Sequence, residues 1–146
     1  MKLTEHFHLG EFIESDYALR HGIKNLPSPE QERNILIAAQ NMEKVRSLLG
    51  DNPITITSGF RNPEVNRGIG STSRSHHPTG FAVDFKCWGF GSPRKIVDVI
   101  HRSDLMFDQL IEEGNWVHID FHPKMRRQTL IANFKSRGRV SYSLLS

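Results

Sequence analysis

Two histidines precede a glycine, and an aspartate interrupts an apolar run, in the stretch SRSHHPTGFAVDF at residues 73–85. Side chains in a β-strand alternate between the two faces of a sheet, so Asp84 lies on the face opposite Val83 and Phe85. A carboxylate away from water is costly unless it is paired or bound to a metal. The pattern therefore predicts that Asp84 projects into a pocket on the face away from the core.

A second stretch, WVHIDF at residues 116–121, repeats this alternation. Trp116, His118 and Asp120 share one face of the expected strand, and the apolar side chains between them share the other. Two separate strands thus each offer one possible metal ligand. The histidine pair that precedes the strand of Asp84 offers a third.

Two histidines and one carboxylate are a ligand set of catalytic zinc sites, in which the fourth position stays open for water. Cys87 is the only cysteine in the chain, which excludes a thiolate cluster and an internal disulfide. Iron accepts the same ligands and is the chemical competitor. Because a single strand histidine is more often structural than a ligand, spacing alone leaves both interpretations open.

The composition is that of an ordinary soluble globular protein with one domain. The chain has 146 residues, of which 37% are hydrophobic and 24% charged. No apolar run has the length of a membrane span, and the opening MKLTEHFHLGEF lacks the apolar segment of a secretory signal.

The charge is distributed unevenly along the chain. After Asp120 there are six basic residues and no acidic one, whereas the first 120 residues hold 13 basic and 16 acidic residues. Such an end indicates either an anionic partner surface or a solvated edge that protects the sheet from aggregation. It lacks interleaved aromatics and any nucleic-acid motif, so we expect no nucleic-acid partner. The basic residues are Lys124, Arg126, Arg127, Lys135, Arg137 and Arg139.

The elements that must position these residues include a long helix over residues 29–49. Ser28 can cap this helix, Pro29 suits its first position, and Gln31 completes a capping box. Apolar residues at helical spacing give it one buried face, and Gly50 is a natural C-terminal cap. We expect it to support the core without taking part in chemistry.

Alternating, β-branched segments predict a mostly antiparallel sheet. Between the first two strands lies a long loop rich in glycine and serine, residues 59–80, which is a length typical of functional or mobile loops. Gly114 and Asn115 form a two-residue turn signal for a hairpin, and a second helix begins at Ser92 and Pro93. The expected strands are 53–58, 81–87, 108–113, 116–121, 129–134 and 139–145.

Together these elements predict a small single α+β domain, with helices packed on the sheet. We divide residues 1–146 into a helical N-terminal part (1–50), a metal-site core (53–121) and a basic C-terminal part (122–146).

Three motifs in a fixed order resemble the zinc D-Ala-D-Ala carboxypeptidase family. That family includes phage L-alanyl-D-glutamate endolysins and vancomycin-resistance dipeptidases, and it is structurally allied to the Hedgehog signalling domain. Residues 6–30 look like the leader of the phage-associated branch, and the resemblance extends to about residue 130. The motifs are S-x-H-x-x-G-x-A-x-D (Ser75, His77, Gly80, Ala82, Asp84), W-V-H (Trp116 to His118) and SGFR (58–61), followed by Asn66.

The resemblance implies that His77, Asp84 and His118 bind one Zn²⁺ per chain. Of the two adjacent histidines, the motif selects His77, which lies seven residues before Asp84. His76 falls on a variable position. We expect it to be a loop histidine, and the alternative is a residue that supports a metal ligand or faces the substrate.

The resemblance also implies roles for two polar residues outside the ligand set. Arg61 resembles the family arginine that binds the substrate carboxylate or the developing oxyanion, a task for which its planar fork is suited. Ser75 is expected to hydrogen-bond the substrate or to hold the loop. Asp120 and His122 match no motif position, and we expect both to be structural.

The resemblance does not assign the general base directly, because this chain departs from the family pattern at that position. Many family members place a carboxylate three residues before the last histidine, where this chain has Asn115. The alternatives are Glu112 and Glu113. If the hairpin turn has two residues, Glu113 pairs with Trp116, and paired residues share a face. This register favours Glu113 as the catalytic base on the side of His118, whereas a longer turn would favour Glu112.

The function implied by the resemblance is a zinc metallopeptidase that hydrolyses amide bonds in peptidoglycan stem peptides. The first expectation is an L-Ala-D-Glu endopeptidase of the phage endolysin type. The alternatives are a D-Ala-D-Ala carboxypeptidase or dipeptidase, and a catalytically inactive, zinc-stabilised cell-wall-binding module. We expect a monomer that is made in the cytoplasm and reaches the wall through holin-assisted release or as part of a virion.

Overall fold

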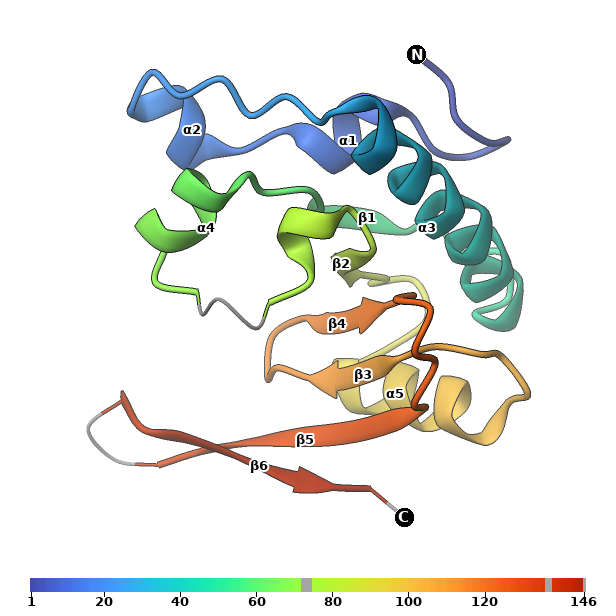
Figure 1. Cartoon of the computed structure of the whole chain (residues 1–146). Coiled ribbons are helices and arrows are strands. Elements are labelled where there is room, and N and C mark those ends of the chain that lie inside the picture. The colour runs from blue at the N-terminus through green and yellow to red at the C-terminus, as the bar shows by residue number, and fades with distance from the viewer. Residues whose placement is uncertain (72–74, 136–137, 146) are drawn as a thin grey trace.

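The computed structural model describes residues 1–71, 75–135 and 138–145 (Figure 1). Within these ranges one six-stranded sheet has the order β1-β2-β4-β3-β5-β6. The strands are β1 (Thr55–Ser58), β2 (Ala82–Lys86), β3 (Gln109–Glu112), β4 (Val117–Asp120), β5 (Gln128–Phe134) and β6 (Val140–Leu144). The helices are α1 (Leu9–Ile13), α2 (Asp16–Arg20), α3 (Pro29–Leu48), α4 (Pro63–Gly68) and α5 (Pro93–Arg102), with a 3₁₀ turn η1 (His77–Thr79).

Neighbouring strands are antiparallel except for the parallel pair β3 and β5. The predicted small α+β domain with a mostly antiparallel sheet is therefore confirmed. The expected strands are all present, and most are shorter at their ends than the sequence predicts. None of the helices that the structure describes combines the length and the apolar character needed to cross a membrane.

The two faces of the central strands differ in character. Val83, Val117 and Ile119 point into a core that α3 and α5 also line. The intervening residues Asp84 and His118 point to the other face, as the alternation predicts. This second face carries the candidate site.

Helix α3 begins with the predicted capping box. The Ser28 hydroxyl accepts from the backbone N–H of Gln31, and the Gln31 side chain accepts from the backbone N–H of Ser28. The helix buries one apolar face in the core and is followed by Gly50, whose φ is 72°. The predicted boundaries are thus confirmed to within a residue or so.

The same helix also anchors the turn that carries His77. Gln31 Nε2 donates to the carbonyl of Pro78 at 3.1 Å, and Asn34 Nδ2 donates to the carbonyl of Thr79 at 2.9 Å. Gly80 follows with φ of 92°, and a Cβ there would lie 2.7 Å from the Gln31 carbonyl oxygen. Only glycine therefore fits the point where the chain leaves η1 for β2.

The segment 59–80 is more regular than the predicted loop. It contains α4, whose N-cap Asn62 accepts from the backbone N–H of Val65, and whose first residue is Pro63. This is the same cap-then-proline start that identifies α3, but the surrounding glycines and serines obscured it. Residues 72–74 of the segment lie outside the described residues.

The basic end of the chain has mixed roles. Arg127 donates to the carbonyl of His101 in the last turn of α5 at 3.2 Å and to that of Leu105 in the segment after the helix at 3.0 Å. Arg126 forms an ion pair with the buried Asp108. These two arginines hold the fold together, whereas the side chains of Lys124, Lys135 and Arg139 are exposed. Arg137 lies outside the described residues.

Candidate metal centre and active site

The sheet and the η1 turn bring together His77, Asp84 and His118, which we call the ligand triad. One donor atom of each lies within 4.8 Å of the others. Asp84 Oδ1 is 2.8 Å from His118 Nδ1, and Asp84 Oδ2 is 3.4 Å from His77 Nε2. Asp84 and His118 are direct partners in the β2–β4 register, which explains how two strands present them side by side.

The triad histidines each turn one ring nitrogen inward and the other toward an outer acceptor. His77 Nδ1 donates to the carbonyl of Gly59 at 2.6 Å, which leaves the Nε2 lone pair facing Asp84. His118 Nδ1 faces Asp84, while its Nε2 lies 3.9 Å from Asp120 Oδ2. Outer acceptors of this kind fix the tautomer and orientation of metal-binding histidines. Two imidazole nitrogens and one carboxylate with this support fit a zinc ion.

The SGFR motif is explained by contacts with the same turn. The carbonyl of Gly59 accepts from His77, and the backbone N–H of Arg61 donates to the His77 carbonyl at 3.2 Å. A Cβ at Gly59 would lie 2.6 Å from the Phe12 carbonyl oxygen, so α1 packs against this point. The motif therefore holds His77 in place, in addition to supplying an arginine.

The pKa values of the three triad residues shift in different directions. Burial works against ionisation of Asp84, yet the neighbouring His77 and His118 hold its pKa far below the usual value. Burial also disfavours charge on His118, but hydrogen bonds with Asp120 and Asp84 outweigh it and raise the His118 pKa. Burial lowers the pKa of His77. A metal ion must consequently displace a proton from His118.

The ligand triad opens onto a cavity of about 700 Å³. The other residues predicted for the site, Arg61, Ser75 and Glu113, all line this cavity, and so does Trp116. The structure thus brings every predicted site residue to one place.

The hairpin register decides which glutamate faces the site. Ile111 pairs with His118, and the backbone N–H of Glu113 donates to the carbonyl of Trp116 at 3.0 Å. The turn therefore has two residues, with Gly114 at φ of 87°. Glu113 lies on the side of His118 as predicted, whereas Glu112 is not among the residues that line the cavity.

Glu113 sits in surroundings that favour its neutral form. Burial raises its pKa, while His118 and a hydrogen bond from the Tyr142 hydroxyl oppose that shift, and the charge on Asp84 adds to it. The hydroxyl donates to Glu113 Oε2 at 3.2 Å. A carboxyl whose pKa moves upward toward neutrality is suited to accept and return a proton.

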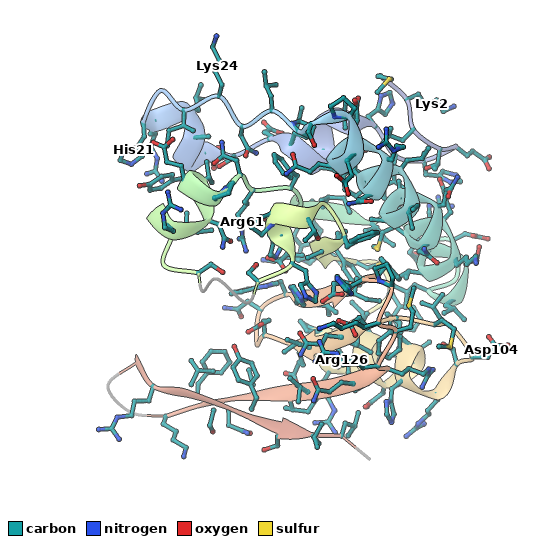
Figure 2. The ribbon with its side chains drawn as sticks, viewed as in Figure 1. Lys2, His21, Lys24, Arg61, Asp104 and Arg126 are labelled. Carbon is teal, nitrogen blue, oxygen red and sulfur yellow. The ribbon has the colours of Figure 1, made fainter. Side chains whose placement is uncertain are left out.

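Arg61 is a mostly buried cation beside the triad, and Figure 2 shows it between α4 and η1. Burial lowers its pKa, and Asp84 partly offsets this. Its Nη1 donates to the Ser58 hydroxyl at 3.3 Å, whereas its Nε has no hydrogen-bond partner among the described residues. Arg61 also lines the cavity, where a guanidinium is suited to bind an anionic group.

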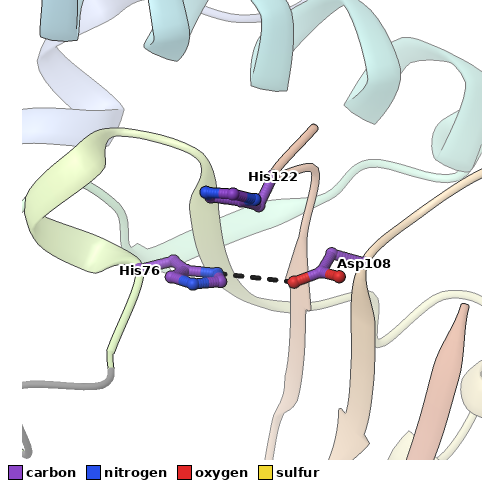
Figure 3. A group of neighbouring side chains, drawn as sticks. All are labelled: His76, Asp108 and His122. Carbon is purple, nitrogen blue, oxygen red and sulfur yellow. Dashed lines mark ion pairs between the residues drawn. The ribbon is translucent and has the colours of Figure 1, made fainter. Parts of the chain in front are cut away.

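A second cluster, which we call the stacked group, was not predicted from the sequence. It consists of His76, Asp108 and His122, whose donor atoms also lie within 4.8 Å of one another (Figure 3). The rings of His76 and His122 are stacked, with centroids 4.4 Å apart and planes at 23°. The nitrogen lone pairs lie in the ring planes, so two stacked rings cannot both point at one ion.

The carboxylate of the stacked group is engaged mainly by Arg126, and its Oδ2 also lies 3.6 Å from His76 Nδ1 (Figure 3). Asp108 Oδ1 accepts from Nε and the backbone N–H of Arg126 at 2.7 and 3.1 Å, and Oδ2 accepts from Nη2 at 2.9 Å. Burial raises the pKa of Asp108, but these bonds outweigh it and lower the pKa to about 2. The geometry favours a hydrogen-bonded support over a second metal site.

His76 and Asp120 connect the two clusters. His76 lies in the loop before η1, as expected, but its Nδ1 donates to Asp120 Oδ2 at 3.0 Å. Asp120, which was expected to be structural, lines the cavity, and the same oxygen faces His118 Nε2. The alternation of the strand predicts that Asp120 and His118 share one face, and this is the sequence feature from which their contact could have been predicted.

Comparisons with known proteins identify the family of the chain and one curated relative. The model of the peptidase M15 family matches residues 5–120. A zinc D-Ala-D-Ala carboxypeptidase from Streptomyces albus G is 37% identical over 51 residues, which are 35% of this chain and 20% of that protein. The chain thus matches about a fifth of the length of this curated relative.

Proposed function

Because the chain belongs to the peptidase M15 family, we propose that it is a zinc-dependent peptidase that hydrolyses amide bonds of bacterial cell-wall peptide. The observation that carries this proposal is the convergence of the ligand triad, Glu113 and Arg61 on one cavity. The name of the Streptomyces relative supports both the metal and the substrate class.

The ligand triad would hold the zinc ion. Bound there, zinc supplies Lewis acidity and lowers the pKa of water toward neutrality. Gly59 and Asp120 keep the two histidines oriented for this task through the ring nitrogens that face away from Asp84.

Glu113 is the proton carrier of the proposed reaction. Its Oε2 accepts from Tyr142, which leaves Oε1 to take the proton of the attacking water and to return it to the leaving amine. The raised pKa of Glu113 helps the second step, because a more basic carboxylate holds the proton until the amine departs.

Arg61 and Ser75 are the proposed substrate-binding residues. The Arg61 guanidinium, which lines the cavity, suits a substrate carboxylate or the oxyanion that develops as the amide is attacked. Ser75 lines the cavity, and its hydroxyl also accepts from the backbone N–H of His77 at 3.2 Å, so it also holds the ligand loop.

Within this class we propose an L-Ala-D-Glu endopeptidase of the phage endolysin type, supported by the resemblance of residues 6–30 to the leader of the phage-associated branch. D-Ala-D-Ala carboxypeptidase or dipeptidase activity is the second candidate, favoured by the Streptomyces relative and by an arginine suited to a terminal carboxylate. A catalytically inactive wall-binding module fits less well, because Glu113 lines the metal cavity. We further propose a monomer that reaches the wall through a holin or from a virion.

Mass analysis of peptidoglycan digested by the zinc-loaded protein tests this proposal. An endopeptidase of the first kind releases peptides that begin with D-Glu, whereas the second candidate releases D-Ala. Undigested peptidoglycan in the presence of stoichiometric zinc would refute a hydrolytic function and leave the wall-binding module.

A further inference from the structure

The β5–β6 hairpin lies beyond the residues that match the family model, yet it forms one wall of the cavity. In the parallel β3–β5 register Ile111 pairs with Leu130, and in the β5–β6 register Ala132 pairs with Tyr142. Because Ile111 also pairs with His118, alternation places Leu130, Ala132 and Tyr142 on the face of the sheet that carries the ligand triad.

The hairpin also packs against the turn that leads from Glu113 to the last triad histidine. A Cβ at Gly114 would lie 2.7 Å from Cε2 of Phe134, so the Phe134 ring rests directly on this glycine. A Cβ at position 114 would displace the Phe134 ring, which is 62% exposed. The end of β5 is thereby held against the turn next to the proposed base.

The contact between Tyr142 and Glu113 is polar and accessible. The hydroxyl donates to Glu113 Oε2 at 3.2 Å, and the tyrosine remains 49% exposed. A tyrosine with half its surface in solvent contributes little to the core, so core packing does not account for its hydroxyl pointing at Glu113.

We propose that Tyr142 is a positioning residue for Glu113, and that the C-terminal hairpin completes the active site by supplying it. This inference rests on the proposed function for the role of Glu113 as base. The hydroxyl fixes the carboxylate rotamer, occupies Oε2 and leaves Oε1 free for the proton of the attacking water. It also stabilises the ionised carboxylate against its partial burial, which keeps Glu113 able to accept that proton.

The contact is tested by Tyr142→Phe, which keeps the ring and removes the hydroxyl. A matched control is Ser141→Ala, which removes a hydroxyl from the opposite face of the same strand. In zinc-loaded protein we expect Tyr142→Phe to lower kcat about tenfold, with KM and zinc content close to wild type. The acidic limb of the pH profile of kcat should move to higher pH, because Glu113 loses a donor that lowers its pKa. Ser141→Ala should behave as wild type.

A second readout does not depend on activity. Carbon NMR titration of ¹³C-labelled glutamate carboxyls in the zinc-loaded protein should show the pKa of Glu113 rising in Tyr142→Phe and unchanged in Ser141→Ala. An unchanged Glu113 pKa in Tyr142→Phe would overturn the proposal, as would a rise in KM with kcat unchanged, which indicates substrate contact alone. If the NMR shift appears while wild type hydrolyses no peptidoglycan, the contact stands and the proposed function fails.

Discussion

The ligand triad and the stacked group have the same composition, two histidines and one aspartate, but their rings and carboxylates are arranged differently. In the triad the His77 and His118 rings meet at 62° with centroids 5.2 Å apart, whereas the stacked rings meet at 23°. The triad carboxylate faces both of its histidines, and the stacked carboxylate is occupied by an arginine. Ring orientation and the absence of an arginine on the carboxylate distinguish the proposed metal site from a second cluster of the same residues.

The difference also indicates what the stacked group contributes. Arg126 neutralises Asp108, and Asp108 Oδ2 lies 3.6 Å from His76 Nδ1. His76 in turn bonds to Asp120, which faces the outer nitrogen of His118. His118 is thus connected to Arg126 through Asp120, His76 and Asp108.

The largest expected difference between the clusters is in zinc binding. His77→Ala or His118→Ala should reduce bound zinc from about one ion per chain to nearly none, because each removes one of three ligands. His122→Ala, the matched change in the stacked group, should leave zinc content unchanged. Elemental analysis of the purified variants measures this, and equal zinc loss in His122→Ala would contradict the distinction.

A smaller effect is expected at the link between the clusters. Asp120→Asn should weaken zinc affinity by about 10- to 100-fold, because it weakens the acceptor opposite the outer nitrogen of His118. Competition with a chromophoric chelator gives the affinity, and Asp98→Asn, at a partly exposed position of α5 far from the triad in sequence, is the control. Wild-type affinity in Asp120→Asn would show that this carboxylate does not orient His118.

Zinc affinity should also fall on acidification, by about tenfold per pH unit for each displaced proton. The raised pKa of His118 means that the zinc-free protein keeps this proton at neutral pH, so the ion must release it. Calorimetric titration in buffers of different ionisation enthalpy measures the release, and none at pH 7 would contradict the assignment. Without zinc, the raised pKa stabilises the fold below the unfolded value of about 6.5, and this contribution is lost as pH rises through the folded value.

The smallest effect concerns folding alone. Arg126→Ala should destabilise the protein by about 1–2 kcal/mol, since it removes both side-chain donors from the buried Asp108 while the backbone N–H of residue 126 and the exposure of Arg126 limit the loss. Arg94→Ala breaks an exposed pair with Asp98 and should cost under about 0.5 kcal/mol. Urea unfolding measures the free energy of unfolding of both variants. An equal loss in the two would show that the pair with the buried Asp108 stabilises the fold no more than the exposed pair.

Local patterns were sufficient to predict the parts of the site that depend on alternation and turn length. The two-residue period of a strand predicted that Asp84 and His118 lie on the face of the sheet away from the core. The two-residue turn predicted that Glu113, and not Glu112, lies on the same face as His118. Family resemblance added His77 to this set, and the structure places it beside the other two ligands.

The unpredicted parts depend on contacts between distant segments. The stacked group joins a loop, the start of β3 and the segment after β4, and no short-range period relates these positions. Tyr142 reaches Glu113 only because β5 pairs in parallel with β3, and the sequence does not reveal that pairing.

The central claim, that the ligand triad holds zinc and Glu113 moves the proton beside it, is tested most directly by one comparison of hydrolysis rates. Peptidoglycan hydrolysis by zinc-loaded Glu113→Gln is measured against wild type and against Glu112→Gln, with zinc content determined in each sample. We expect a loss of at least about 100-fold in Glu113→Gln at full zinc content, and a rate close to wild type in Glu112→Gln. Full activity in Glu113→Gln, or a loss confined to Glu112→Gln, would contradict the account.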